Sequence, residues 1–361
     1  MKERIYVCHT YYHVYITLLK ELKIRAEEGS SWAPHATLIL SKMSTDFEEL
    51  HTRLSECGLF AEILDYDEKR ESFFPELESL RADTGSGLGN LRQRIRLTRR
   101  FAQLQEPFLP VDFRQYKQIY VFCDADPIGV YLNQKHIRYH AVEDGLNCIA
   151  NGDLARFDNR GHFPLKAFLS LHLNLIFIPN GYGKYCIDME INDRSRLIYQ
   201  DFRKYIEVPR LPLRDRLTDA DRELILKVFL KNKAALEQRV AEASKAGDGI
   251  LLLTEPLCTL EIRKQIFTDL IERYQKEGTV FLKPHPRDEL DYETLFPEIP
   301  QIDKKVPMEM LHFMPGAHFK KAVGVLTEMS DFPYADESIR LGPDFLDAYE
   351  EPSIHRQNEQ I

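Results

Sequence analysis

The chain has 361 residues, a formal net charge of −9, 43% hydrophobic residues and 29% charged residues. At about 150 residues per domain, this length predicts two domains. The apolar content excludes disorder over most of the chain, and no run approaches the ~20 apolar residues of a membrane-spanning helix. The acidic balance argues against a general nucleic-acid binder.

Cysteine usage and the first residues indicate a reducing compartment. The six cysteines are scattered and none forms a Cys-x-x-Cys pair, so we expect neither a zinc site nor a disulfide framework. Residues 1–8 lack the basic, apolar and small-residue regions of a signal peptide. We therefore expect a cytoplasmic protein.

Short apolar runs alternate with helical patterns along the chain. The predicted strands are Arg4–Cys8, Ala36–Leu40, Glu62–Tyr66, Gln118–Cys123, Arg138–Val142, Leu175–Pro179, Gly249–Thr254, Thr279–Lys283 and Lys321–Leu326. The predicted helices are Tyr11–Ala26, Asp46–Glu56 with a capping box of Thr45 and Glu48, Pro127–Lys135, Asp219–Ala246 and Leu260–Lys276. Strands that are apolar throughout are typical of a parallel sheet covered on both faces. The alternation predicts an α/β, doubly wound architecture.

Two boundaries divide the chain. Residues 206–218 hold two prolines and no clear period, which predicts a linker. The polar helix that follows ends at a glycine-rich stop around residue 247. We predict a Rossmann-like domain over 1–205, a linker and connecting helix over 206–247, a second Rossmann-like domain over 248–340 and a tail over 341–361.

Two adjacent carboxylates, Glu143 and Asp144, end one predicted strand, and Gly145 follows them. In a parallel sheet, ligands bind at the carboxyl ends of strands. Two acids there repel each other, which can raise the pKa of one and suit it to act as a base. The glycine allows a sharp turn. An ordinary strand-to-turn boundary with solvated acids fits the same pattern.

A histidine between two prolines follows another predicted strand, in the run Lys-Pro-His-Pro-Arg from Lys283 to Arg287. The prolines restrict the backbone and so orient the imidazole of His285. Such a histidine can donate to a phosphate oxygen, and the neighbouring cations suit an anion. A histidine packed in a rigid loop is the alternative. A carboxylate on one domain and a histidine on the other would suit transfer from a phosphate-activated donor.

These motifs resemble those of glycosyltransferase family 52, the bacterial lipooligosaccharide and capsule sialyltransferases. Val142–Gly145 resembles the family's Asp/Glu-Asp/Glu-Gly motif, and Lys283–Pro286 resembles its His-Pro motif. Leu252–Leu257, Lys283–Tyr292 and Ile5–His13 are also similar to segments of that family. The similarity spans most of the chain.

The resemblance implies a GT-B fold, with two Rossmann-like domains facing across a cleft, and an inverting, metal-independent transfer without a cofactor. It implies that Asp144 is the general base that takes the proton of the acceptor hydroxyl. It also implies that His285 binds the leaving phosphate of a cytidine nucleotide and assists its departure. Glu143 and Gly145 would shape the acceptor loop. His13, after the first predicted strand, is expected to contact the acceptor, although packing in the core fits it equally well.

Lys283, Pro286, Thr327 and Ser330 are expected to bind the donor nucleotide and its phosphate. The family usually carries a Ser-Ser or Ser-Thr pair after a late strand, where hydroxyls and helix N-terminal amides hold the phosphate. Here Thr327 and Ser330 are the hydroxyls at that place, and Glu328 adds a negative charge. This departure is compatible with a different cytidine-activated donor.

Two further segments outside these motifs carry charged side chains in a pattern. Asp124 and Asp126 form an Asp-x-Asp pair after a strand, which in a GT-A transferase would hold a divalent metal. However, Pro127 at a first helical position favours Asp126 as a helix N-cap, and we predict no metal site. The arginine-rich segment Leu88–Gln105 suits either an anionic membrane surface or a solvated helix face.

The sequence thus predicts a sialyltransferase that moves sialic acid from CMP-sialic acid to a galactose-type hydroxyl of a bacterial surface glycan. We further expect that the acceptor is lipid-linked, that the protein contacts the inner face of the cell membrane peripherally and that it forms a homodimer. Two alternatives stay open: a phosphotransferase using a CDP-alditol or another nucleotide-sugar transferase, and a non-catalytic protein that binds nucleotides or glycans.

Overall fold

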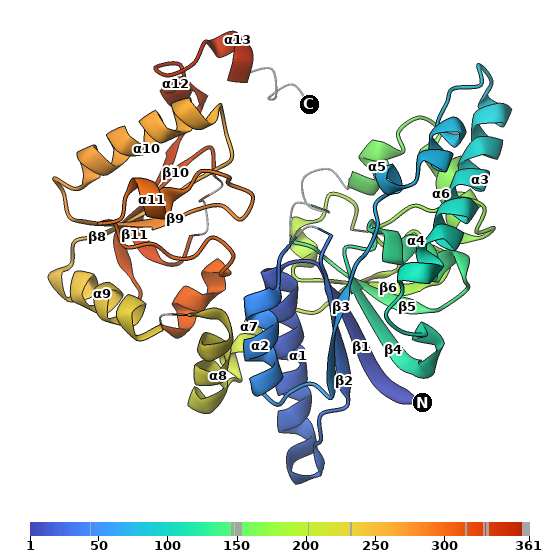
Figure 1. The fold of residues 1–361 in the computed structure, drawn as a ribbon, viewed down its shortest axis with the longest axis horizontal. Coiled ribbons are helices and arrows are strands. Elements are labelled where there is room, and N and C mark those ends of the chain that lie inside the picture. The colour runs from blue at the N-terminus through green and yellow to red at the C-terminus, as the bar shows by residue number, and fades with distance from the viewer. Residues whose placement is uncertain are drawn as a thin grey trace. The chain divides into compact units, whose positions relative to one another are not determined.

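The computed structural model describes the chain except residues 44, 146, 147, 149–153, 201, 232, 315, 328, 330, 331 and 356–361, and residues 154 and 355 by their backbone alone. The chain divides into two compact units, Met1–Asp221 and Arg222–Ile361. Each unit has a parallel sheet with helices packed on it, as Figure 1 shows. We call them the N-terminal and the C-terminal unit.

The N-terminal unit has a seven-stranded sheet in the order β3-β2-β1-β4-β5-β6-β7. Its strands are β1 (Lys2–Cys8), β2 (Ala36–Ser41), β3 (Glu62–Tyr66), β4 (Tyr116–Phe122), β5 (Tyr139–Val142), β6 (Cys186–Ile191) and β7 (Tyr205–Glu207). All neighbouring strands run parallel. The strand order reverses between β1 and β4, so the topological switch point, where such sheets bind ligands, lies at the carboxyl ends of these two strands.

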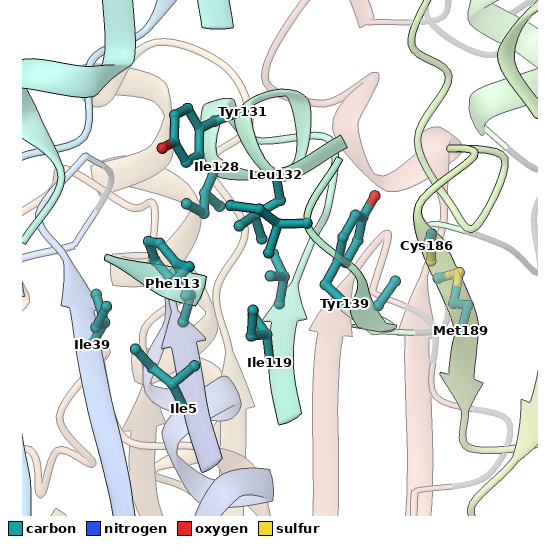
Figure 2. Close-up of a cluster of buried hydrophobic side chains, with 14 of the residues drawn as sticks. Ile5, Ile39, Phe113, Ile119, Ile128, Tyr131, Leu132, Tyr139, Cys186 and Met189 are labelled. Atoms are coloured by element: carbon teal, nitrogen blue, oxygen red, sulfur yellow. The ribbon is translucent and has the colours of Figure 1, made fainter. Parts of the chain in front are cut away.

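Helices cover both faces of this sheet. The helices of this unit are α1 (Tyr11–Glu28), α2 (Glu48–Glu56), α3 (Gly87–Gln105), α4 (Pro127–Gln134), α5 (Leu154–Asp158), α6 (Phe163–Leu171) and α7 (Arg210–Asp215). The next helix, α8 (Asp219–Phe229), contains the unit boundary. On one face, Ile128 and Leu132 of α4 pack on Ile5, Ile119 and Tyr139 of the strands (Figure 2). Burial of these apolar groups stabilises the sheet–helix contact.

The other face of the sheet packs on α1 through buried polar contacts as well as apolar ones. Glu21 of α1 accepts hydrogen bonds from Arg4 Nε at 2.9 Å and from Tyr6 Oη at 2.7 Å. Lys20 pairs with Glu190 of β6. These contacts connect α1 with β1 and β6, and therefore fix the position of the first turn of α1 above the switch point.

The C-terminal unit has a four-stranded parallel sheet in the order β11-β10-β8-β9. Its strands are β8 (Gly249–Leu253), β9 (Thr279–Lys283), β10 (Phe319–Val325) and β11 (Ala335–Leu341), and its further helices are α9 (Lys233–Ala246), α10 (Leu260–Tyr274), α11 (Tyr292–Leu295), α12 (Pro343–Leu346) and α13 (Pro352–His355). The switch point of this sheet lies between β8 and β10. No helix in the described part of the chain is long and apolar enough to cross a membrane.

The structure confirms the parallel α/β units and eight of the nine predicted strands, with ends shifted by at most two residues. The ninth prediction, Leu175–Pro179, is wrong, because this segment is an apolar loop that packs against α6. Sequence reasoning missed β6, β7 and β11. In β6, the charges of Asp188 and Glu190 hid the strand, and β11 is a largely exposed edge strand.

Two helix predictions also need correction. The predicted helix over 219–246 is two helices, α8 and α9, separated near residue 231. The predicted capping box at Thr45 is wrong: Phe47 is the N-cap residue of α2, and Asp46 Oδ1 accepts from Glu48 N at 3.0 Å. The segment predicted as a linker, residues 206–218, includes the end of β7 and all of α7. The predicted domain limits otherwise stay a prediction.

Candidate functional site

Titratable side chains gather at the switch point of the N-terminal sheet. His9 follows β1, Asp126 follows β4, Asp144 follows β5, and His13 lies in the first turn of α1. That turn forms because Thr10 caps the helix, with its hydroxyl accepting from His13 N at 3.3 Å. The cap therefore places an imidazole where three strands end.

His13 is completely buried, and both of its ring nitrogens are engaged. Nδ1 accepts the main-chain N–H of His9 at 3.0 Å, so the proton of the neutral ring sits on Nε2. That Nε2–H donates to Asp144 Oδ1. The ring also stacks on Phe122, with centroids 4.7 Å apart. Burial lowers the pKa of His13, and the hydrogen bond and charge of Asp144 only partly oppose this. His13 is therefore neutral at pH 7 and holds one oxygen of Asp144.

Asp144 is the exposed carboxylate of the predicted pair, with 41% of its side chain accessible. Its neighbour Glu143 is buried at 1% exposure, and burial raises the pKa of Glu143. The main-chain N–H of Asn192 acts against this rise. Gly145 adopts φ +122°, a conformation that side chains rarely allow. The turn therefore presents Asp144 at the surface and keeps Glu143 inside.

A second pair of a histidine and a carboxylate, His9 with Glu68, lies beside the His13–Asp144 pair. His9 Nε2 lies 2.7 Å from Glu68 Oε2 and 3.4 Å from Asp126 Oδ2. Glu68 also accepts from Ser41 Oγ and Ile128 N, each at 2.7 Å. Burial alone would lower the pKa of His9, but the charge and hydrogen bond of Glu68 outweigh it and raise that pKa to about 9. His9 and Glu68 thus form a buried ion pair that ties β1, β2 and α4 together.

The Asp-x-Asp pair is built into the fold. Asp124 is 1% exposed and accepts from Asn180 N at 2.6 Å, Tyr139 Oη at 3.1 Å and Gly181 N at 3.4 Å. Asp126 is the N-cap residue of α4, as predicted, but its side chain makes no capping hydrogen bond. Burial raises the pKa of Asp126 to about 6. Because amide and phenol groups occupy Asp124, the pair does not present two carboxylates to a cation.

In the C-terminal unit, His285 follows β9 and is held by its own loop. Its Nδ1 accepts the main-chain N–H of Arg287 at 3.1 Å, and its backbone N donates to Thr254 Oγ1 at 3.0 Å. Burial and the nearby charge of Arg287 lower the pKa of His285. The ring is therefore neutral at pH 7 and carries its proton on Nε2. The side chain of His285 as a whole is 24% accessible.

A buried aspartate supports this loop. Asp288 is completely buried, and its main-chain N–H donates to His285 O at 2.9 Å. Its carboxylate accepts from Arg263 Nη1 at 2.6 Å, Thr254 Oγ1 at 2.8 Å, Tyr292 Oη at 2.9 Å and Leu290 N at 3.1 Å. These four hydrogen bonds anchor the loop through the Asp288 carboxylate. The loop in turn holds Arg287 N where it donates to the His285 ring.

Across the switch point of this unit, Glu255 follows β8 and Thr327 follows β10. Thr327 Oγ1 donates to Glu255 Oε1 at 3.3 Å, and His285 Nε2 lies 3.9 Å from Glu255 Oε2. Leu326 adopts φ +60°, and a Cβ on Gly324 would lie 2.8 Å from Thr327 Cβ. The chain therefore turns back sharply after β10 and brings the threonine hydroxyl to the carboxylate.

Two other predicted donor residues, Lys283 and Pro286, flank His285 in the chain. Lys283 is 5% exposed, and its Nζ donates to Lys304 O at 2.9 Å and Pro284 O at 3.1 Å. Burial lowers the pKa of Lys283 to about 7. Pro286 is exposed. Ser330 and Glu328 lie outside the described residues.

The structure brings the predicted residues together in two groups, His13 with Asp144 and His285 with Thr327. Their catalytic and binding roles stay predictions. Sequence reasoning missed the His9–Glu68 pair and the place of Glu255 beside both donor-side residues. These residues are far apart in the sequence, so no local pattern predicts their contacts. The one available signal is that each of them follows a predicted strand, at the carboxyl edge of its sheet.

Comparison with known proteins identifies the family of the chain. The model of glycosyltransferase family 52 matches residues 80–326. A protein of Haemophilus influenzae described as uncharacterized is 28% identical over 98 residues, which cover 26% of this chain and 31% of that protein.

Two solved structures share the fold at low identity. The GT-B domain of a sialyltransferase from Photobacterium damselae is 14% identical, with a TM-score of 0.52 over 91% of this chain and 86% of that one. An α/β-galactoside α-2,3-sialyltransferase from Photobacterium phosphoreum is 13% identical, with a TM-score of 0.51 over 93% and 89%. The predicted GT-B fold is confirmed.

Proposed function

Because the chain belongs to glycosyltransferase family 52, we propose that it is an inverting, metal-independent sialyltransferase. It moves sialic acid from CMP-sialic acid to a galactose-type hydroxyl of a bacterial surface glycan. The observation that carries this proposal is Asp144, an accessible carboxylate at a switch point with one oxygen held by the neutral ring of His13. The fold of two sialyltransferases with which the chain aligns over most of its length supports the same activity.

On the acceptor side, Asp144 acts as the general base. Its Oδ1 accepts the Nε2–H of His13, and 41% of its side chain is accessible to an acceptor hydroxyl. The hydroxyl proton passes to this carboxylate as the hydroxyl oxygen attacks the anomeric carbon. Attack on the face opposite the leaving group inverts the configuration at that carbon.

On the donor side, His285 stabilises the leaving group. The new bond joins the acceptor oxygen to the anomeric carbon, and the bond between that carbon and the phosphate oxygen breaks. The electron pair of the broken bond remains on the phosphate of the nucleoside monophosphate. The Nε2–H of His285 donates to this oxygen, where negative charge develops.

The chemistry requires no metal in this scheme, since the imidazole N–H of His285 stabilises the developing charge. The occupied oxygens of Asp124 are consistent with that scheme, because an Asp-x-Asp transferase needs both carboxylates for the cation. Full activity in the presence of excess EDTA is the expected result.

We also propose that the protein works in the cytoplasm, as a homodimer, on a lipid-linked glycan at the inner face of the cell membrane. The arginine-rich helix α3 supports the peripheral contact. Arg92, Arg96 and Arg99 are exposed, whereas Arg94 binds Asn159 Oδ1 at 2.6 Å. Exposed arginines on one helix attract anionic headgroups at low ionic strength.

Product analysis tests the function. The purified chain is incubated with CMP-sialic acid and a fluorescent galactoside, and the product is examined by mass spectrometry and sialidase digestion. A sialidase-sensitive product supports the proposal. A phosphodiester product from a CDP-alditol would indicate the phosphotransferase. Absence of transfer and of donor hydrolysis, with nucleotide binding retained, would indicate a binding protein.

A further inference from the structure

Glu255 is a carboxylate beside His285 and Thr327, the residues assigned to the donor phosphate. A phosphate site is expected to contain groups that attract a negative charge. The carboxylate lies 3.9 Å from His285 Nε2 and accepts from Thr327 Oγ1 at 3.3 Å, so it engages both side chains assigned to the donor phosphate. A quarter of the Glu255 side chain is accessible. A phosphate bound to the imidazole and the hydroxyl would therefore have a carboxylate as a close neighbour.

The charges around Glu255 only partly balance it. Burial raises the pKa of Glu255, while the Thr327 hydrogen bond and the charge of Arg287 lower it and the charge of Asp288 raises it. His285 is neutral, as its own lowered pKa indicates. Among the described residues, the exposed guanidinium of Arg287 is the positive charge that lowers the pKa of Glu255. The Asp288 carboxylate accepts hydrogen bonds from four donors.

We propose that Glu255 makes the donor site discriminate between a phosphodiester and a free nucleoside monophosphate, and so promotes release of the nucleotide after transfer. This inference rests on the proposed function, because it assumes a donor in which the sugar is linked through a single phosphate. It assigns Glu255 a role in specificity and product release, separate from the roles of Asp144 and His285.

The physical basis is the charge difference between donor and product. In the donor, both ester bonds are present and the phosphate carries one negative charge. After transfer, the nucleotide is a phosphate monoester whose second pKa is about 6, so it carries nearly two charges at pH 7. A fixed carboxylate a few ångströms away repels the second charge as well as the first, and it repels the dianion more. The carboxylate therefore weakens the binding of the product nucleotide more than the binding of the donor.

A matched pair of ligands isolates this effect. Cytidine 5′-monophosphate and its methyl phosphodiester differ in the second ionisation and in one methyl group. Their dissociation constants are measured by calorimetry on the full chain, for the wild type, for Glu255→Gln and for Glu272→Gln. Glutamine keeps the shape of Glu255 and still accepts from Thr327, while Glu272 is an exposed residue near the end of α10 and controls for the loss of one charge from this unit.

For Glu255→Gln at pH 8, we expect binding of the monophosphate to tighten by about 10-fold and binding of the methyl ester by no more than about 3-fold. At pH 5 the difference between the ligands should disappear, because the monophosphate then carries one charge. Product inhibition in the transfer assay should strengthen in parallel. Glu272→Gln should bind both ligands as the wild type does.

Two outcomes would overturn the inference in distinguishable ways. If both ligands bind the wild type but Glu255→Gln changes their affinities equally, or not at all, Glu255 has no role in discrimination and the proposed function stands. If neither cytidine ligand binds the wild type while a uridine nucleotide does, the proposed donor is wrong and the inference fails with it.

Discussion

The two switch points hold a histidine in the same way and use it differently. In both, Nδ1 accepts a main-chain N–H, from His9 at 3.0 Å and from Arg287 at 3.1 Å, and in both burial lowers the pKa. Each ring is thereby fixed as the Nε2–H tautomer. The ring of His13 is fully buried and donates to Asp144, whereas 24% of the His285 side chain is accessible.

This difference shows how one local device serves two purposes. A buried donor can hold a carboxylate in place, and we propose that His13 positions Asp144 in this way. An accessible donor can bind an anion itself, which is the role proposed for His285 at the phosphate. The carboxylate nearest to each ring differs accordingly: Asp144 is a direct acceptor, and Glu255 is 3.9 Å away.

Replacing Asp144 by asparagine is expected to have the largest effect, because it removes the proposed base at the first switch point. Asparagine keeps the size of the side chain and still accepts from His13, but it cannot take a proton. We expect turnover to fall by at least about 100-fold, the usual contribution of a general base. The steady-state rate with CMP-sialic acid and a galactoside measures it. Asp215→Asn removes an exposed aspartate of α7 and should leave the rate within about 2-fold. Full activity of Asp144→Asn would discard the proposed base.

The His9–Glu68 pair makes the stability of the N-terminal unit depend on pH. The pKa of His9 is raised to about 9 in the folded chain, above the ~6.5 of an unfolded histidine. Its stabilisation is therefore complete below pH ~6.5 and is lost as the pH rises through about 9, a change on the order of 3 kcal/mol.

Hydrogen exchange of β1 and β4 amides, measured as a function of urea from pH ~6 to ~10, reports on this unit alone. His9→Gln should flatten the dependence, because glutamine does not titrate. Identical pH dependence in the variant and the wild type would show that His9 is not the group responsible.

His285→Ala removes the accessible donor of the second switch point. A hydrogen bond to a charged group contributes about 2 kcal/mol, so we expect turnover to fall by about 30-fold. His318→Ala is the matched control, since His318 is a half-exposed histidine of the same unit paired with Asp336. Equal losses in the two variants would indicate a general effect on the unit rather than a role at the phosphate.

The sequence predicted much of this arrangement because strand ends are local features. The apolar runs before Asp144 and His285 located the carboxyl edges of two sheets, and ligands bind at such edges. The pairing of His13 with Asp144 was not predictable, since it depends on the order of the strands and on the start of α1. Glu255 was hidden for the same reason: its closeness to Thr327 follows from the β8–β10 pairing.

His13→Leu and His13→Gln form the finest test of the comparison. Both remove the ring and its stacking on Phe122, but only glutamine retains an N–H at the place of Nε2. A hydrogen bond donated to a carboxylate favours its charged form. In His13→Leu, the acidic limb of the kcat/KM profile should therefore move to higher pH by about one unit, and turnover at the optimum should fall by about 10-fold because Asp144 is no longer held.

Glutamine at this position should restore most of the rate and return the acidic limb toward that of the wild type. Thermal unfolding of the two variants provides the control, because a purely structural role of His13 would lower their stability equally and leave both profiles alike. Equal profiles would mean that the ring only fills space. A profile that follows the N–H donor would mean that the buried histidine acts through Asp144, whereas its accessible counterpart His285 is proposed to act on the phosphate directly.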